Sequence, residues 1–83
     1  MQEIKVSIII PTYNRKKPLQ DTVRELLKQN YQNYEIIIVS QKYKVKPFNH
    51  PKVRIFHLSK ANLPNARNYG IKKSSGDIVV FLD

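Results

Sequence analysis

The side chains that could do chemistry in this chain stand where apolar runs end. The turn of residues 11–15 follows one aliphatic run, Ser40 and Gln41 follow a second, and Asp83 follows a third. These positions offer hydroxyl and amide groups for hydrogen bonds, a guanidinium and a carboxylate. Groups of this kind suit the binding of a ligand, and we therefore expect the functional residues to be among them.

Composition excludes several common kinds of site. Gly70 and Gly76 are the only glycines, so the chain has neither a Gly-rich dinucleotide loop nor a P-loop. It has no cysteine, which excludes disulfides and thiolate metal sites. His50 and His57 lack a companion at metal-ligand spacing and stand beside no nucleophile motif, so we expect neither a structural zinc nor a hydrolytic triad.

The chain is strongly basic, with 15 Lys and Arg against six acids and a net charge of +9. Such a surplus suits anionic partners, which include nucleotide diphosphates, acidic membrane surfaces and nucleic acid. The charges are spread out, with small groups at residues 15–17 and 42–46, and a solvated surface explains them equally well. Because no stacking-aromatic or helix-turn-helix motif accompanies them, we expect no nucleic-acid partner.

Apolar patterning predicts four strands. Aliphatic runs cover residues 4–10, 34–39, 53–58 and 78–82. Short runs of this kind are typical of strands buried on both faces of a parallel sheet. The polar and basic segment 40–52, which contains Pro47 and Pro51, is predicted to be a loop.

Two helices are predicted between the strands. The first begins near Pro18 and ends near Asn30. Its apolar face is formed by Leu19, Val23, Leu26 and Leu27. The second helix covers residues 64–73, with Asn62 as its N-cap and Ser74 to Gly76 closing it. We expect Tyr69 and Ile71 to be packing residues, and Gly70 to let the helix approach a strand closely.

The order strand–helix–strand–strand–helix–strand predicts one α/β domain, residues 1–83, with an open parallel sheet. With the strands numbered along the chain, the expected order in the sheet is 3-2-1-4. Ligands in such sheets bind in the crevice beyond the carboxyl ends of the strands, where the order reverses. The turn 11–15, Ser40 and Asp83 are expected to meet there.

Three segments together resemble the family 2 glycosyltransferases. They are Val-Ser-Ile-Ile-Ile-Pro-Thr-Tyr-Asn-Arg at 6–15, Ala66-Arg67-Asn68 followed by Gly70, and Gly-Asp at 76–77 leading to Leu-Asp at 82–83. The segments stand in order on the expected strands and helix, and the resemblance covers the whole chain. It implies the Rossmann-like, nucleotide-binding half of a GT-A fold.

In that family the turn after the first strand lines the base and ribose pocket of a nucleotide-sugar donor, usually a UDP-sugar. The resemblance therefore places these residues at the nucleotide: Pro11, Thr12, Tyr13 and Arg15. Loop amides and a hydroxyl suit the edge of uracil, and a guanidinium suits a diphosphate. Arg67 either lies beside the nucleotide pocket or, with Asn68, holds its helix against the end of the sheet. Asn14 is expected only to shape the turn of residues 11–15.

The segment after the second strand departs from the family. The family commonly has an aspartate-rich turn there that contacts the base or ribose, whereas residues 40–43 are Ser-Gln-Lys-Tyr. Ser40 and Gln41 could hydrogen-bond a base, and we include both among the nucleotide-binding candidates. The acidic contact is lost, which leaves the base of the donor open.

Asp83 matches the first aspartate of the family's Asp-X-Asp motif, whose carboxylates bind Mg²⁺ or Mn²⁺ at the donor diphosphate. One carboxylate holds a metal poorly, so we expect the metal in an intact enzyme and not on this chain alone. The resemblance implies an inverting glycosyltransferase that moves a sugar from its donor to a hydroxyl acceptor of unknown identity. The 83-residue chain itself is expected to be inactive and to contain no catalytic residue.

A second hypothesis is a module of the same fold that binds nucleotides without catalysis or associates with itself. The last strand is expected to be an unpaired edge, through which copies of the chain could form a homo-oligomer. The apolar runs are far shorter than the roughly 20 residues that cross a bilayer, and the first residues do not resemble a signal peptide. We therefore expect a cytoplasmic protein, with membrane association of an intact protein left open.

Overall fold

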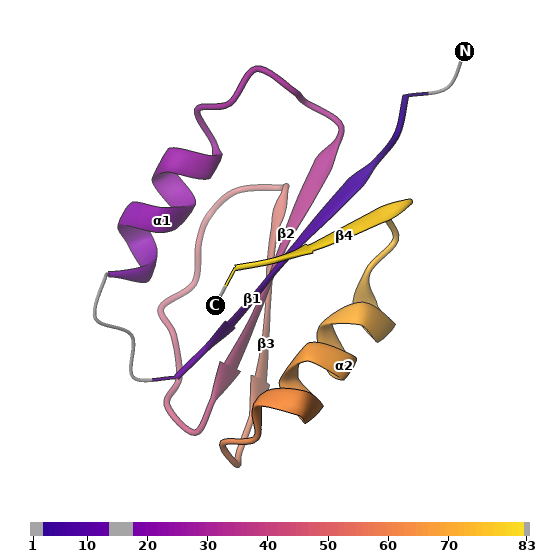
Figure 1. Cartoon of the computed structure of the whole chain (residues 1–83). Helices are drawn as coiled ribbons and strands as arrows, with labels where there is room; N and C mark the ends of the chain where they lie inside the picture. Colours follow the sequence, from indigo (N-terminus) through magenta and orange to yellow (C-terminus); the bar gives the residue numbers. More distant parts are fainter. Residues whose placement is uncertain (1–2, 14–17, 83) are drawn as a thin grey trace.

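The structure, a computed structural model, describes residues 3–13 and 18–82 of the chain. Its elements follow one another in the order β1-α1-β2-β3-α2-β4 (Figure 1). Their bounds are β1 Val6–Thr12, α1 Leu19–Leu26, β2 Tyr34–Gln41, β3 Val53–Leu58, α2 Leu63–Lys73 and β4 Ile78–Phe81. The predicted succession of strands and helices is thus confirmed.

The four strands form one sheet in the order β3-β2-β1-β4, and all neighbouring pairs run parallel (Figure 1). Ile9 of β1 lies opposite Ile37 of β2 on one side and opposite Phe81 of β4 on the other. The predicted open parallel α/β sheet and its 3-2-1-4 order are therefore confirmed. β1 and β2 are the inner strands, which explains why their sequences are the most continuously aliphatic.

Each face of the sheet has its own apolar core, because successive side chains of a strand point to opposite faces. On one face, α1 packs Leu19 and Val23 against a cluster that includes Ile8, Ile10 and Ile36. On the other, Ala66 of α2 packs against Ile9, Ile37 and Val39. The two helices thus cover opposite faces of the sheet, as the crossovers of a parallel sheet require.

Several element ends differ from the sequence prediction because pairing, and not apolar character, sets them. β1 and β2 extend past their aliphatic runs, since Pro11 pairs with Val39 and Thr12 with Ser40. A proline is tolerated there because the pairing with β4 ends opposite Ile9, and among the described residues only β2 pairs with β1 at Pro11.

Two further expectations, both about helical segments, were wrong. α1 ends at Leu26, not near Asn30. The chain turns away in residues 27–30, and the amides of Lys28 and Gln29 bond carbonyls three residues back. Ile71 was expected to pack, but 46% of it is exposed because α2 turns that side chain away from the sheet.

α2 is fixed at both its cap and its closest approach to the sheet. The Asn62 side chain accepts a hydrogen bond from the Asn65 amide (3.1 Å), which confirms the predicted N-cap. At Gly70 a Cβ atom would lie 2.4 Å from Cγ2 of Ile9, so only glycine lets α2 lie this close to β1.

Within residues 3–13 and 18–82, neither helix has the length and apolar character needed to cross a membrane.

Candidate functional site at the carboxyl edge of the sheet

The carboxyl ends of β1 and β2 lie side by side and bring the predicted residues together. Thr12 pairs with Ser40 in the sheet, and Pro11 with Val39, so Tyr13 and Gln41 each follow directly at the same edge. Pro11 and Thr12 are buried, whereas Tyr13 is 45% exposed. Tyr13 therefore places an accessible aromatic ring above the buried end of β1.

Ser40 and Gln41 point into the protein and hold neighbouring segments. Ser40 Oγ lies 2.8 Å from Nδ1 of His57 on β3. The Gln41 side-chain oxygen accepts a hydrogen bond from the backbone amide of Asn62 (2.9 Å), which ties the end of β2 to the start of α2. Both residues are almost wholly buried, 1% and 3% exposed. Their side chains position this edge of the sheet from beneath.

Tyr43 and Lys42 belong to the same edge and were not among the site residues predicted from the sequence. The rings of Tyr13 and Tyr43 are stacked, with centroids 5.9 Å apart and planes 10° from parallel. Lys42 Nζ lies 5.4 Å from the centroid of the Tyr43 ring. The signal in the sequence was a tyrosine and a lysine directly after the strand whose end carries Ser40 and Gln41.

Arg67 of α2 reaches the end of β4. Its guanidinium carbon lies 5.6 Å from the ring centroid of Phe81, the last residue of that strand. Leu82 follows, and its amide bonds the Ile9 carbonyl (2.9 Å), which keeps the chain beside β1 as far as residue 82. The other predicted site residues, Arg15 and Asp83, lie outside the described residues, as does Asn14.

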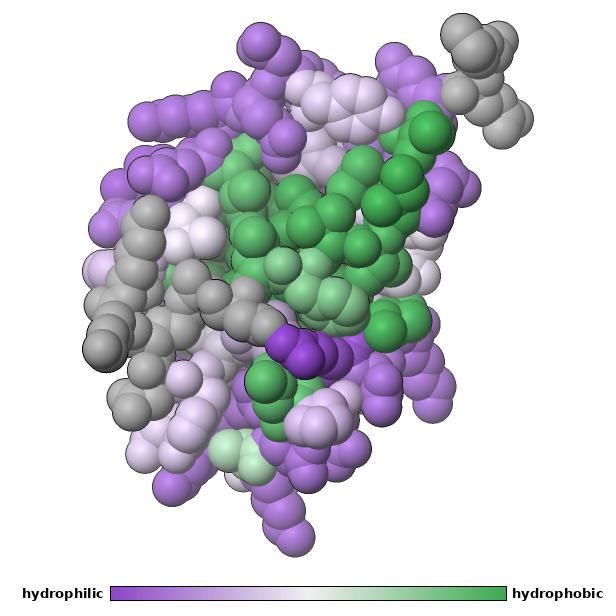
Figure 2. Space-filling model, in the orientation of Figure 1, coloured by the Kyte–Doolittle hydropathy of each residue, from purple (hydrophilic) through white to green (hydrophobic). Residues whose placement is uncertain are grey.

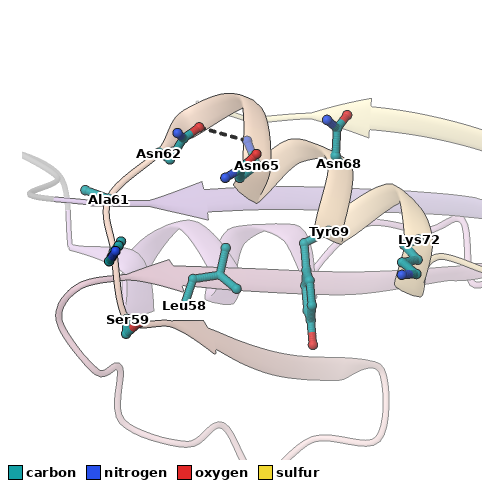
Figure 3. A pocket seen from close by; sticks show the side chains of 9 residues that line it. Leu58, Ser59, Ala61, Asn62, Asn65, Asn68, Tyr69 and Lys72 are labelled. Atoms are coloured by element: carbon teal, nitrogen blue, oxygen red, sulfur yellow. Dashed lines mark hydrogen bonds between the residues drawn. The ribbon is translucent and has the colours of Figure 1, made fainter.

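A groove of about 540 Å³ lies beside this edge, between α2 and the end of β3 (Figure 3). Tyr69 points from α2 toward β3, where Leu58 and Ser59 form the opposite wall (Figure 3). Asn62, which Gln41 holds, stands at its rim. Of the predicted nucleotide-binding residues that the structure describes, none lines this groove, which was not expected from the sequence.

The described residues do not form a metal centre by themselves. No group of three or more His, Cys, Asp or Glu side chains gathers anywhere in the described part of the chain. Mg²⁺ and Mn²⁺ take about six oxygen ligands, of which the single candidate carboxylate, Asp83, could supply only a part. The donor set of the described residues alone does not fit a divalent cation.

A buried carboxylate ties the opposite, amino edge of the sheet together. Glu35 of β2 accepts hydrogen bonds from Ser7 Oγ (2.6 Å) and the Ser75 amide (2.6 Å), and Arg54 Nη1 lies 3.5 Å from its second oxygen. Burial alone would raise the pKa of Glu35, but the hydrogen bonds from Ser7 and Ser75 and the nearby charge of Lys5 outweigh it and hold the pKa below its ordinary value. This cluster fixes the turn into β4, far from the carboxyl edge.

The chain is similar in sequence to known glycosyltransferases. A family model described as "Glycosyl transferase family 2" matches residues 7–83. The chain is 33% identical over 93 residues to an uncharacterized glycosyltransferase of Rickettsia bellii, covering 100% of this chain and 13% of that protein.

Two further relatives have more specific names. The chain is 30% identical over 90 residues to the UDP-Glc:alpha-D-GlcNAc-diphosphoundecaprenol beta-1,3-glucosyltransferase WfgD of Escherichia coli, covering 100% of this chain and 36% of that protein. It is 32% identical over 94 residues to the amylovoran biosynthesis glycosyltransferase AmsB of Erwinia amylovora, covering 100% of this chain and 31% of that protein. The chain thus spans 13–36% of the length of these three relatives.

Proposed function

The chain belongs to glycosyl transferase family 2, and from this premise we propose that it is the nucleotide-sugar-binding part of an inverting glycosyltransferase. The observation that carries the proposal is the meeting of Thr12, Tyr13 and the end of β2 at the carboxyl edge of a parallel sheet. Ligands bind at this edge in open α/β sheets. The name of the Escherichia coli relative, which specifies UDP-Glc, supports a UDP-sugar as donor.

The proposed roles follow from the chemistry of each group. Tyr13 and Thr12 receive the base and ribose, with Pro11 shaping the strand end and Ser40 and Gln41 supporting it from beneath. Arg15 and Arg67 supply positive charge for the diphosphate. Asp83, with a further carboxylate of an intact enzyme, would hold Mg²⁺ or Mn²⁺, which stabilises the departing diphosphate when bound.

The proposed reaction is a direct displacement at the sugar. An acceptor hydroxyl oxygen forms a bond to the anomeric carbon, and the bond from that carbon to the diphosphate oxygen breaks. The hydroxyl proton passes to a carboxylate base. No residue of this chain is assigned that base, so we propose that the 83-residue chain binds the donor and does not turn it over. We also retain the cytoplasm as its proposed compartment.

Calorimetric titration tests this proposal. UDP should bind saturably, with a Kd on the order of 1 mM, and uridine should bind more weakly because it lacks the charge that the arginines receive. Mn²⁺ should change the affinity of this chain for UDP by less than about twofold, since one carboxylate is a poor metal site. A heat signal no larger than buffer dilution at millimolar UDP would refute nucleotide binding by this chain.

We further propose that the chain associates with itself through β4. Ile78, Val80 and Phe81 of this edge strand are 47%, 41% and 36% exposed, and apolar side chains gather over β1 and β4 beside α1 (Figure 2). The other edge strand, β3, carries the exposed and polar Arg54 and His57, which discourage pairing. A two-fold axis would pair β4 with β4 of a second copy in antiparallel fashion.

Sedimentation velocity tests this association. The native chain should show a concentration-dependent dimer, and Val80→Lys should shift it to monomer because a charge would be buried at the junction. Ile71→Lys is the matched control: Ile71 is 46% exposed on α2, away from the edge, and its substitution should leave the dimer intact. Even a weak dimer, with a Kd of about 1 mM, would be partly populated at a chain concentration of about 1 mM. A native chain that stays monomeric at that concentration refutes the proposal.

A further inference from the structure

Two exposed tyrosines from distant parts of the chain are stacked at the proposed nucleotide site. Tyr13 follows β1 and Tyr43 follows β2, and their rings lie nearly parallel with centroids 5.9 Å apart. They are 45% and 59% exposed, so solvent reaches much of both rings. Stacked, exposed aromatic rings are the surface on which nucleic-acid bases stack in many proteins.

A strained turn holds Tyr43 in this position. Lys42 has φ 67°, and it is the only non-glycine residue with positive φ in the described part of the chain. The Tyr43 amide bonds the Gln41 carbonyl (2.7 Å), which closes a three-residue γ-turn of the rare type with positive φ at its centre. The Lys42 amide bonds the Leu58 carbonyl (2.8 Å) and anchors the turn to the end of β3. Strain of this kind persists where the surrounding structure enforces it, and it concentrates at binding sites.

The two polar side chains at the end of β2 are poorly placed to read a base. Ser40 and Gln41 are buried, and their side chains already bond His57 and the Asn62 amide. The sequence contains no Asp or Glu between Glu35 and Asp77, so no carboxylate follows β2 to accept hydrogen bonds from a base or ribose. Among the described residues, the segment after β2 offers the ring of Tyr43 and the Lys42 ammonium, which lies 5.4 Å from the Tyr43 ring centroid.

We propose that Tyr43, with Tyr13 and Lys42, forms an aromatic platform on which the nucleotide base of the donor stacks. This inference rests on the proposed function and assigns Tyr43 and Lys42 to the same site. Stacking tolerates any base, because every base has a π-face, whereas hydrogen bonds to a base edge select one. The site therefore accepts nucleoside diphosphates with little discrimination among bases, and the Lys42 ammonium beside the Tyr43 ring supplies a positive charge for their phosphates.

Calorimetric titration of the native chain with UDP, TDP, GDP and ADP tests the platform. Because purines offer the larger ring surface, GDP and ADP should bind at least as tightly as UDP, with all four within about fivefold. Tyr43→Ala should weaken all four nucleotides by at least about fivefold, the loss expected for removing one base–aromatic stack. Tyr43→Phe, which keeps the ring, should bind within about twofold of the native chain, since the stack needs no hydroxyl.

Two controls separate the platform from other causes. Tyr31→Ala removes a ring that is 43% exposed in the turn before β2, at the opposite edge, and should not change nucleotide affinity. Lys42→Gly accommodates the positive φ but loosens the turn and removes the charge, and should weaken binding as Tyr43→Ala does.

If UDP binds but GDP and ADP do not, or if Tyr43→Ala binds UDP like the native chain, the platform is refuted while the proposed function stands. If no nucleoside diphosphate binds the native chain, both are refuted.

Discussion

Replacing Glu35 with glutamine should lower the free energy of unfolding by about 2–3 kcal/mol at pH 7. The carboxylate accepts hydrogen bonds from the Ser7 hydroxyl and from both the amide and the hydroxyl of Ser75. Glutamine would keep the shape but place an NH₂ group or a weaker, neutral acceptor against these donors. The Ser7 hydroxyl and the Ser75 amide and hydroxyl would then lack a full hydrogen-bond acceptor. An unsatisfied buried donor lowers stability more than the loss of an exposed hydrogen bond does. Urea unfolding followed by circular dichroism measures the change.

The same substitution should flatten the acid limb of the stability profile. The pKa of Glu35 in the fold lies below its value in the unfolded chain, about 4.3. Ionised Glu35 therefore stabilises the fold above that unfolded value, and the contribution is lost as the pH falls through the folded pKa. The native chain should lose stability below about pH 4 more steeply than Glu35→Gln. Glu3→Gln, at an exposed position, is the control and should follow the native curve; parallel acid limbs for native chain and Glu35→Gln would contradict the assignment.

Gly76→Ala should be still more damaging, costing about 3 kcal/mol or more. A Cβ atom at this position would lie 2.5 Å from Ser7 Oγ, 2.8 Å from the Ser7 amide nitrogen and 2.9 Å from the Lys5 carbonyl oxygen. Two of these atoms belong to the backbone of β1 or its approach, so relief requires the turn into β4 to move away from the sheet. The Gly76 amide also donates to Ser7 Oγ (2.8 Å), and that bond would be lost. Thermal unfolding should show a much lower midpoint or no cooperative transition.

A double variant identifies the cause of that loss. If the backbone contacts dominate, Ser7→Ala combined with Gly76→Ala should not recover stability, because the Ser7 amide and Lys5 carbonyl remain in place. Gly70→Ala is the comparison, since all three nearest atoms there belong to the Ile9 side chain, and its loss should be smaller. Full recovery in the double variant would show that the Ser7 hydroxyl alone, and not the backbone, requires glycine at this turn.

The sheet could be predicted from sequence because its inner strands consist almost entirely of aliphatic residues. β1 and β2 are covered on both faces, so almost every residue from Ile8 to Ile10 and from Ile36 to Val39 had to be aliphatic. The alternation of strands and helices then limits the topology to a few arrangements, and the observed order is one of them. Glu35 was overlooked inside such a run because its partners, Ser7 and Ser75, lie 28 and 40 residues away.

The candidate site was predicted only where local sequence determines it. The turn after β1 and the end of β2 follow from the strands themselves, so Thr12 and Ser40 could be expected to meet. The contact between Tyr13 and Tyr43 could not, because it depends on positive φ at a lysine, which propensity gives no reason to expect. The inward orientation of Gln41 likewise depends on the backbone amide of Asn62, in a segment whose path the sequence leaves open.

The most direct test of a nucleotide site at the carboxyl edge is to map UDP binding residue by residue with amide NMR shifts. The proposed site predicts saturable shifts at Thr12, Tyr13, Lys42 and Tyr43, with the amino-edge residue Ser75 unchanged. Saturable shifts confined to the groove between α2 and β3, or none at millimolar UDP, would contradict it.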